Sequence, residues 1–275
     1  MIAITTTDLH LRQGPGSSYR SLAVLPIGTR LDVVAIAPGW TEVLGRGWVS
    51  SAYLRPGQSD VTPLPLPDLY SPHAQLGSVE ARHARLSLEA VGEGAERAHR
   101  IIELLDVEHS ARYQPAAGKT YCNIYATDFA HLWGAFLPRT WWTQDAIRQI
   151  QAVGEMRPAY AQTVTELNAN ALYDWLWLYG TQYGWTSHAS ADELQRTVNA
   201  GGIGVICAAR TDPTRSGHIT VCVPETATHR ASRKIEGGPV ISPLQSQAGT
   251  TNRAYHVTAW WGAAVYRKYG FWSHT

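Results

Sequence analysis

The chain has 275 residues, and its hydrophobic content of 44% is enough to fill one large core or two ordinary ones. The formal charge is +1 and only 16% of residues are charged, which argues against nucleic acid or an anionic membrane surface as the main partner. No run approaches the roughly 18 apolar residues of a membrane span, and residues 1–5 show neither a basic nor an apolar leader. We therefore expect a globular protein without membrane insertion and without a signal peptide.

Residues 1–55 consist of short alternating segments separated by turns, which predicts a small β-barrel. Residues 13–16 and 26–29 are the clearest turns, because glycine tolerates positive φ and proline fixes its own φ. The predicted strands cover residues 8–12, 21–25, 30–35, 40–43 and 47–49.

This segment resembles a bacterial SH3 domain. The resemblance rests on Leu9-x-Leu11-Arg12-x-Gly14-Pro15-x-x-x-Tyr19, Leu25-Pro26-x-Gly28-Thr29, Gly39-Trp40 and Gly47-Trp48-Val49-x-x-x-Tyr53-Leu54. It implies a domain that binds bacterial cell-wall peptides and tethers an enzyme to peptidoglycan. Candidate wall-facing residues are Tyr19, Trp40, Trp48 and Tyr53. The alternative is that most of these aromatic side chains, Trp40 and Trp48 above all, fill the barrel.

A change of composition marks a domain boundary after the barrel. Residues 55–67 are rich in proline and polar residues, which predicts an extended, semi-rigid connector, and residues 69–93 carry mixed helical and turn signals. Ala95, Ala98, Ile102 and Leu105 then recur at helical spacing. The predicted organisation is a domain at 1–55, a linker at 56–93 and a second domain at 94–275.

A cysteine lies at the start of the next predicted helix. Thr120 is the expected N-cap, Cys122 lies in the first turn, and Gly134 ends the helix. The free N–H groups and the positive dipole end of the first turn favour a thiolate over a thiol. This position predicts a nucleophile, although a cysteine in an apolar helix is more often a buried hydrophobic residue.

A histidine opens a predicted strand about a hundred residues later. Residues 191–199 predict a helix, residues 203–208 a central strand, and residues 211–217 a loop before the His218 strand. Alternation places His218, Thr220 and Cys222 on one sheet face, on which the Cys122 helix is expected to pack. By default such a histidine is structural or lies at the surface, and the chain has eleven.

Together, these two neighbourhoods resemble the papain-like peptidoglycan hydrolases of the CHAP and NlpC type. The resemblance spans residues 94–272, but its tight motifs are confined to the surroundings of Cys122 and His218. It implies an α+β domain with a central antiparallel sheet, next to the all-β SH3-like barrel. It also implies that Cys122 attacks a carbonyl carbon while His218 holds the thiolate and protonates the leaving amine.

In that family a third polar residue, on the strand after the histidine strand, orients the imidazole. Residues 241–249 are the expected place, and Gln247 is favoured, with Gln245 and Glu225 as alternatives. The oxyanion would meet the Cys122 N–H and one further donor, for which the Tyr121 side chain is a candidate. Asn123 is a candidate for substrate binding or for securing the helix start.

Tryptophan is concentrated in the second part of the chain. Nine of the eleven tryptophans lie beyond residue 130, and Trp142 and Trp185 are placed nearest a substrate groove. Core packing is the better default for most of the nine.

No metal, cofactor or disulfide framework is expected. His-Glu-x-x-His, Cys-x-x-Cys and Gly-x-Ser-x-Gly motifs are absent, which disfavours a zinc site and a serine hydrolase elbow. The cysteines are odd in number, namely Cys122, Cys207 and Cys222, so at least one is free.

The favoured function is hydrolysis of an amide bond in peptidoglycan, by an N-acetylmuramoyl-L-alanine amidase or a stem-peptide endopeptidase. The expected partner is bacterial peptidoglycan, the expected state is a monomer, and the expected place of action is the bacterial cell wall. The protein would be secreted, released by a phage or delivered by another cell. The alternatives are a catalytically silent wall-binding or phage structural protein and a secreted antibacterial effector amidase.

Overall fold

The computed structural model describes residues 2–37, 39–43, 45–57 and 94–275. The chain forms two compact units, which we describe separately. Apart from its first two residues, the linker predicted for residues 56–93 lies outside the described residues. The domain boundaries therefore stay a prediction.

The first unit is a seven-stranded antiparallel sheet with the strand order β3-β2-β6-β5-β4-β1-β7. The five strands expected from alternation are all present, and β1 and β7 are additions that pair with each other. The strands are β1 Ile2–Thr5, β2 Leu9–Arg12, β3 Ser21–Leu25, β4 Arg30–Ala37, β5 Trp40–Val43, β6 Gly47–Ser50 and β7 Leu54–Pro56, with a short 3₁₀ helix at Ser51–Tyr53.

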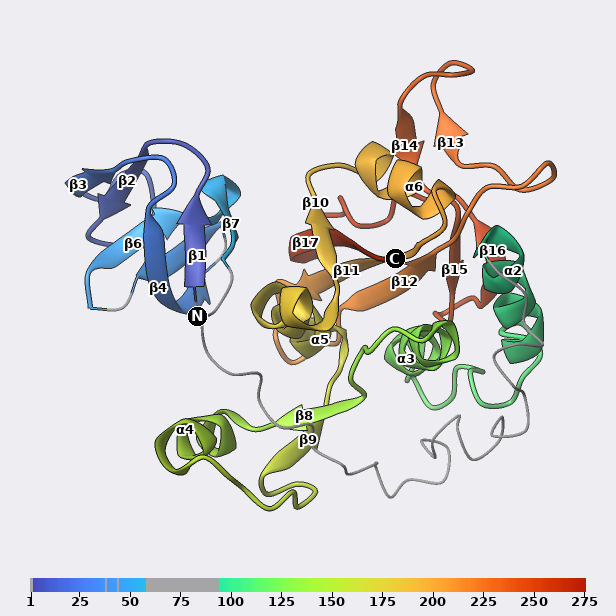
Figure 1. Ribbon diagram of the computed structural model, residues 1–275, viewed down its shortest axis with the longest axis horizontal. Coiled ribbons are helices and arrows are strands. Elements are labelled where there is room, and N and C mark those ends of the chain that lie inside the picture. The colour runs from blue at the N-terminus through green and yellow to red at the C-terminus, as the bar shows by residue number, and fades with distance from the viewer. Residues whose placement is uncertain (1, 38, 44, 58–93) are drawn as a thin grey trace. The chain divides into compact units, whose positions relative to one another are not determined.

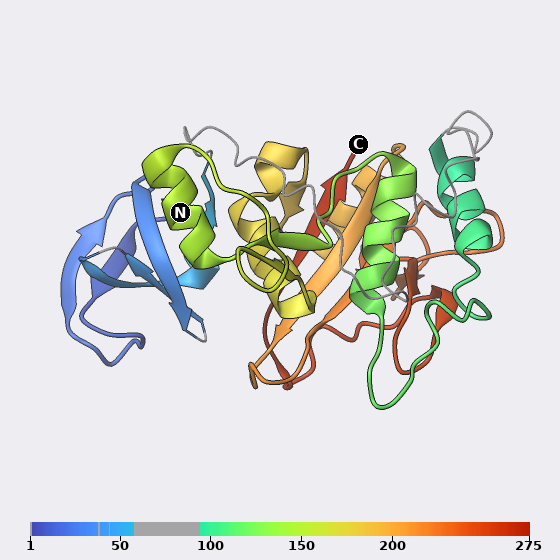
Figure 2. The ribbon, with the colours of Figure 1, turned by 90° about the horizontal axis from the view of Figure 1, so that it is seen from below.

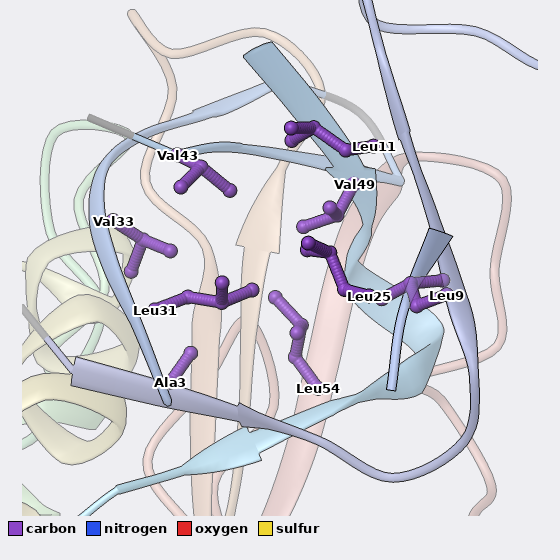
Figure 3. Packing of buried hydrophobic residues seen from close by; sticks show 9 residues of the cluster. All are labelled: Ala3, Leu9, Leu11, Leu25, Leu31, Val33, Val43, Val49 and Leu54. Atoms are coloured by element: carbon purple, nitrogen blue, oxygen red, sulfur yellow. The ribbon is translucent and has the colours of Figure 1, made fainter. Parts of the chain in front are cut away.

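The core of this unit is aliphatic (Figure 3). Its buried members are Ala3, Leu9, Leu11, Leu25, Leu31, Val33, Val43, Val49 and Leu54. Within β5 the buried residues are Thr41 and Val43, so alternation turns Trp40 outward, and the same argument turns Trp48 outward from β6. The interpretation that Trp40 and Trp48 fill the barrel is therefore wrong.

The second unit is built on a six-stranded antiparallel sheet with the order β10-β17-β11-β12-β15-β16. This confirms the predicted α+β fold with a central antiparallel sheet. Its helices are α2 Gly94–Leu105, α3 Cys122–Trp133, α4 Gln144–Val153 and α6 Ala191–Asn199. Helix α5 Ala169–Leu178 and a 3₁₀ helix at Gly180–Tyr183 are divided between the units, since Asp174–Gln182 belong to the first. The sheet strands are β10 Thr186–His188, β11 Ile203–Arg210, β12 His218–Cys222, β15 Gln245–Gln247, β16 Arg253–His256 and β17 Tyr266–His274. Two small sheets pair β8 Thr140–Trp142 with β9 Val164–Glu166 and β13 Ser232–Arg233 with β14 Val240–Ser242.

Helices cover both faces of this central sheet, as Figures 1 and 2 show. Leu194 and Val198 of α6 pack with Cys222 on one face. On the other face, the Tyr125 hydroxyl of α3 lies 2.6 Å from Ser246 Oγ, and Ser246 is paired with Val221. The helix that carries Cys122 thus packs on the Val221 face.

The expectation that α3 lies on the face of His218, Thr220 and Cys222 is wrong. That face is occupied by α6, which packs Leu194 and Val198 against it. Cys122 nevertheless meets His218, because the first turn of α3 lies beside the first residues of β12 and its thiol is hydrogen-bonded to the Ile219 backbone. The two side chains meet at the end of the strand.

Two features fix the position of α3. Helix α3 begins one residue later than expected, since Tyr121 and not Thr120 occupies the N-cap, and it ends at Gly134 with φ 95° as expected. In the middle of the helix Asp128 is buried and accepts hydrogen bonds from Arg112 and from the Tyr113 hydroxyl, at 2.6–3.0 Å. This paired charge prevents the helix from rotating or sliding without breaking buried hydrogen bonds.

Candidate active site

Cys122 is the first residue of α3, and its side chain is buried, with 2% of the residue exposed. The thiol is hydrogen-bonded to His218 and to the backbone at Asn123 and Ile219. Backbone N–H groups at a helix start stabilise a negative charge. A sulfur in this position is surrounded by groups that favour the thiolate.

His218 is the first residue of β12 and lies between Cys122 and Gln247. Its Nε2 donates to the Gln247 side-chain oxygen at 2.8 Å, so Nδ1 is the ring nitrogen left for the thiol. Gln247 is the third residue of β15, and its amide nitrogen donates to the Thr251 carbonyl at 3.1 Å, which orients the amide. The structure thus brings Cys122, His218 and Gln247 into one hydrogen-bonded series.

The electrostatics of the pair follow from these contacts. Burial by itself raises the pKa of the Cys122 thiol, but the hydrogen bond and the charge of His218 outweigh it, so that the net pKa is lowered. Burial likewise lowers the pKa of His218, while Cys122 and then Gln247 outweigh burial and raise it. Opposite shifts of this kind favour a thiolate–imidazolium pair.

The two alternatives to Gln247 lie elsewhere. Gln245 is fully buried, and its oxygen accepts from Thr220 and from the Trp260 indole nitrogen, both at 2.9 Å. Glu225 forms a two-bond ion pair with Arg233 at 2.6–2.7 Å, which lowers its pKa to about 2. Neither residue contacts His218.

The residues flanking the nucleophile have structural contacts. Asn123 donates from its side-chain nitrogen to the Leu167 carbonyl at 3.0 Å. This bond ties the start of α3 to the residue that follows β9. Tyr121 lies at the N-cap, and its carbonyl accepts from the Tyr125 N–H. Its hydroxyl has no hydrogen-bond partner within residues 94–275 or the other described segments, so its proposed part in an oxyanion site stays a prediction.

Trp142 and Trp185 were expected at a substrate groove, but both are buried in the structure. Trp142 is 4% exposed and lies in β8, while Trp185 is 1% exposed and donates from its indole nitrogen to the Phe136 carbonyl at 2.8 Å. Both rings serve the core of the second unit, because large aromatic surfaces are most stabilising when they are fully buried.

Sequence reasoning missed three residues around the pair. The Trp260 ring lies edge to face with His218 at a centroid distance of 4.6 Å, and Tyr266 lies 5.4 Å from Trp260. The Arg210 guanidinium lies 5.7 Å from the Tyr266 ring centroid, and its Nε donates to the Ser216 carbonyl. The tryptophan count included Trp260, but no spacing relates it to residue 218, so the sequence carries no signal for this contact.

In the first unit, the candidate wall-facing aromatics lie outside the core. Tyr19 is 48% exposed and Tyr53 is 49% exposed, and Trp40 and Trp48 are partly exposed. The Tyr19 ring packs against Gly14, where an added Cβ would lie 2.5 Å from the ring. The glycine of the Gly14-Pro15 turn is therefore required for the tyrosine to lie flat on it.

In the parts of the chain that the structure describes, no group of three or more histidine, cysteine, aspartate or glutamate side chains is arranged to hold a metal ion. Within the same residues, no helix has both the length and the apolar character that a membrane crossing requires.

Residues 7–55 match the family model described as "Bacterial SH3 domain". The first unit is a bacterial SH3 domain. Its match covers the five strands that alternation predicted and all four candidate aromatics.

A curated protein of Bacillus subtilis (strain 168), named "Putative N-acetylmuramoyl-L-alanine amidase YrvJ", is 36% identical to the chain over 61 residues. These residues are 21% of this chain and 12% of that protein, so the chain matches only a small part of its length. The solved structure of NlpC2 from Trichomonas vaginalis is 11% identical, with 94% of this chain and 70% of that chain covered. Its TM-score of 0.23 is too low to carry an argument about fold or function.

Proposed function

We propose that this protein is a peptidoglycan hydrolase that cleaves an amide bond with a cysteine nucleophile. The observation that carries the proposal is the hydrogen-bonded series of Cys122, His218 and Gln247, in which the thiol pKa is lowered although the thiol is buried. The bacterial SH3 domain in the same chain, and the amidase named above, support the cell wall as the place of action.

The proposed reaction begins with a proton on His218 and a thiolate on Cys122. The thiolate sulfur attacks the carbonyl carbon of the amide, and the carbonyl π electrons move to the oxygen, which the Cys122 N–H stabilises. Collapse of this intermediate breaks the C–N bond while His218 transfers its proton to the leaving amine. His218 then takes a proton from water, the resulting hydroxide adds to the thioester carbonyl, and the C–S bond breaks. This releases the carboxylic acid product and restores the thiolate of Cys122 and the proton on His218.

Gln247 has a positioning part in this scheme. Its side-chain oxygen accepts from His218 Nε2, so the imidazole keeps Nδ1 toward the sulfur throughout the proton transfers. An amide is neutral, and it therefore stabilises the imidazolium less than a carboxylate would. Gly249 leaves space for this arrangement, since a Cβ there would lie 3.3 Å from the Gln247 side-chain nitrogen and 3.5 Å from His218 Cε1.

The bacterial SH3 domain would hold the enzyme on its polymeric substrate. Tyr19 and Tyr53 are its most exposed aromatic residues, and amphipathic aromatic side chains suit the binding of a peptide or a sugar face. Replacing each with alanine is expected to reduce co-sedimentation of the full chain with purified cell walls. Replacement of Ile27, which is 66% exposed and aliphatic, is the matched control. Equal losses in all three variants would contradict aromatic recognition.

The decisive experiment for the proposed function is digestion of purified peptidoglycan. The full chain is expected to clear a wall suspension, and Cys122→Ala is expected to leave it turbid. Mass spectrometry of the products identifies the bond, because an amidase releases a sugar-free stem peptide, whereas an endopeptidase cuts within the stem. Clearing by the Cys122→Ala variant at the wild-type rate would exclude this nucleophile.

One observation favours a second function, that of a wall-binding protein without catalysis. Cys122 is only 2% exposed, so a substrate carbonyl reaches the sulfur only if neighbouring side chains move. Iodoacetamide distinguishes the two functions at neutral pH. An ion-paired Cys122 that becomes accessible is alkylated quickly, and a permanently enclosed one is not.

A further inference from the structure

Trp260 makes the nearest aromatic contact to His218 in the described part of the chain. The two ring centroids are 4.6 Å apart and the ring planes are inclined by 71°. Trp260 lies in the connection between β16 and β17, far in sequence from both α3 and β12. A ring in edge-to-face contact at this distance holds the imidazole in place by direct packing.

The position of Trp260 is fixed from behind. Its indole nitrogen donates to the Gln245 side-chain oxygen at 2.9 Å, and its ring lies edge to face with Trp261 and Tyr266. It also packs against the apolar cluster that includes Trp261 and Phe271. A side chain held by one directed hydrogen bond and two ring contacts has little freedom to leave His218.

Gln245 is rigid enough to serve as the anchor. It is completely buried, and its oxygen accepts a second hydrogen bond from the Thr220 hydroxyl at 2.9 Å. Its side-chain nitrogen faces three acceptors, each at 3.2 Å, on Ser242, Pro243 and Thr258. Every polar atom of this buried amide is thus satisfied, and any displacement would leave one of them unpaired.

We propose that Trp260 is a positioning residue of the cysteine–histidine pair, held by Gln245 and acting through the His218 ring. The inference rests on the proposed function, because it gives His218 the task of stabilising a thiolate. Trp260 touches one side of the imidazole while Gln247 holds Nε2, so the ring is fixed both in its plane and in its tilt. Trp260 also keeps water from that side of the ring, which strengthens the ion pair.

Other charged groups face His218 and must be considered in a pH experiment. These are the Cys122 thiolate on α3, which raises the pKa of His218, Arg210 on β11, which lowers it, and His256 on β16, whose own pKa is lowered to about 4. His256 is neutral above that pH. Of these groups, only Cys122 and His218 are expected to change charge over the neutral range, so the experiment reports on their pair.

The test is the pH dependence of Cys122 alkylation by iodoacetamide in the full chain, with the site of modification assigned by peptide mass spectrometry. The wild type is expected to show a reactive limb well below the ordinary cysteine pKa of about 8.5. In Trp260→Ala this limb is expected to move up by about one pH unit, because the imidazolium loses the ring that holds it beside the sulfur. Trp260→Phe keeps a ring and loses the hydrogen bond, so about half of that shift is expected.

Trp133→Ala is the matched control, because it removes a buried tryptophan from the C-terminal end of α3, opposite Cys122. The reactive limb of Cys122 alkylation in this variant is expected to stay at the wild-type pH. An unshifted limb in Trp260→Ala overturns the inference and leaves the proposed function intact. If the alanine variant does not fold, Trp260→Phe decides in the same way. A wild type without any low-pH limb overturns the proposed function and this inference together.

Discussion

Cys122 and Cys222 lie in the same domain and are equally enclosed, with 2% and 0% of each residue exposed, yet their thiols are shifted in opposite directions. Cys222 packs among Leu194, Val198 and Ile206 on the α6 face, and burial alone raises its pKa well above the usual range. Cys122 meets the same penalty, but His218 outweighs it. Burial alone makes a cysteine unreactive, whereas a charged group beside the buried sulfur makes it a nucleophile.

The largest expected effect comes from removing each sulfur in turn. Cys122→Ala is expected to reduce the clearing of a wall suspension by at least about 1,000-fold, because no other group can form the thioester. Cys222→Ala is expected to keep the wild-type rate per folded molecule. Turbidity measured at matched concentrations of folded protein makes the comparison. A loss of similar size in both variants would break the distinction between the two cysteines.

Removing the partner is expected to make Cys122 resemble Cys222. In His218→Ala the burial penalty on the thiolate is no longer offset, so the pKa of Cys122 rises. The higher pKa leaves less thiolate, and alkylation at neutral pH is expected to be roughly 100-fold slower. Stopped-time labelling followed by peptide mass spectrometry measures this rate, and an unchanged rate would show that His218 does not stabilise the sulfur.

Gln247→Leu is expected to have a smaller effect with a defined sign. Gln247 is one of the groups that raise the pKa of His218, so its loss lowers that pKa. The ion pair is then lost at a lower pH as the solution is made alkaline, and the alkaline limb of the activity profile moves toward acid. Loss of one hydrogen bond also predicts about a tenfold lower rate. Gln247→Asn is the control variant, because it keeps the amide and changes only the length of the side chain.

The smallest expected effect on activity comes from the other side of the sheet. Cys222→Ser places a hydroxyl among aliphatic side chains. The free energy of unfolding of this variant is expected to be about 1–3 kcal/mol lower than that of the wild type. Alkylation of Cys122 is expected to keep its wild-type pH dependence. Urea denaturation gives the stability, and a displaced alkylation limb would show that the two faces are coupled.

Local pattern was sufficient for much of the fold. Alternation predicted the barrel strands, and Gly134 predicted the end of α3 because it can adopt a left-handed conformation at little cost. Pattern was misleading where several packings satisfied it equally. The apolar residues on the two sides of β12 allow a helix on either face, and only the competition between α3 and α6 decided between them.

The sequence by itself determined the residue types and their local geometry: a cysteine in the first turn of a helix, a histidine at the start of a strand and a glutamine on a neighbouring strand. Hydrophobic periodicity and helix-terminal preferences act over a few residues, and so they are readable from the chain. The tertiary structure alone decided that Trp260 touches His218, that Gln245 anchors it, and that Trp142 and Trp185 are buried. Such contacts join residues tens of positions apart, and their energy depends on shape and exclusion of water, which no local spacing encodes.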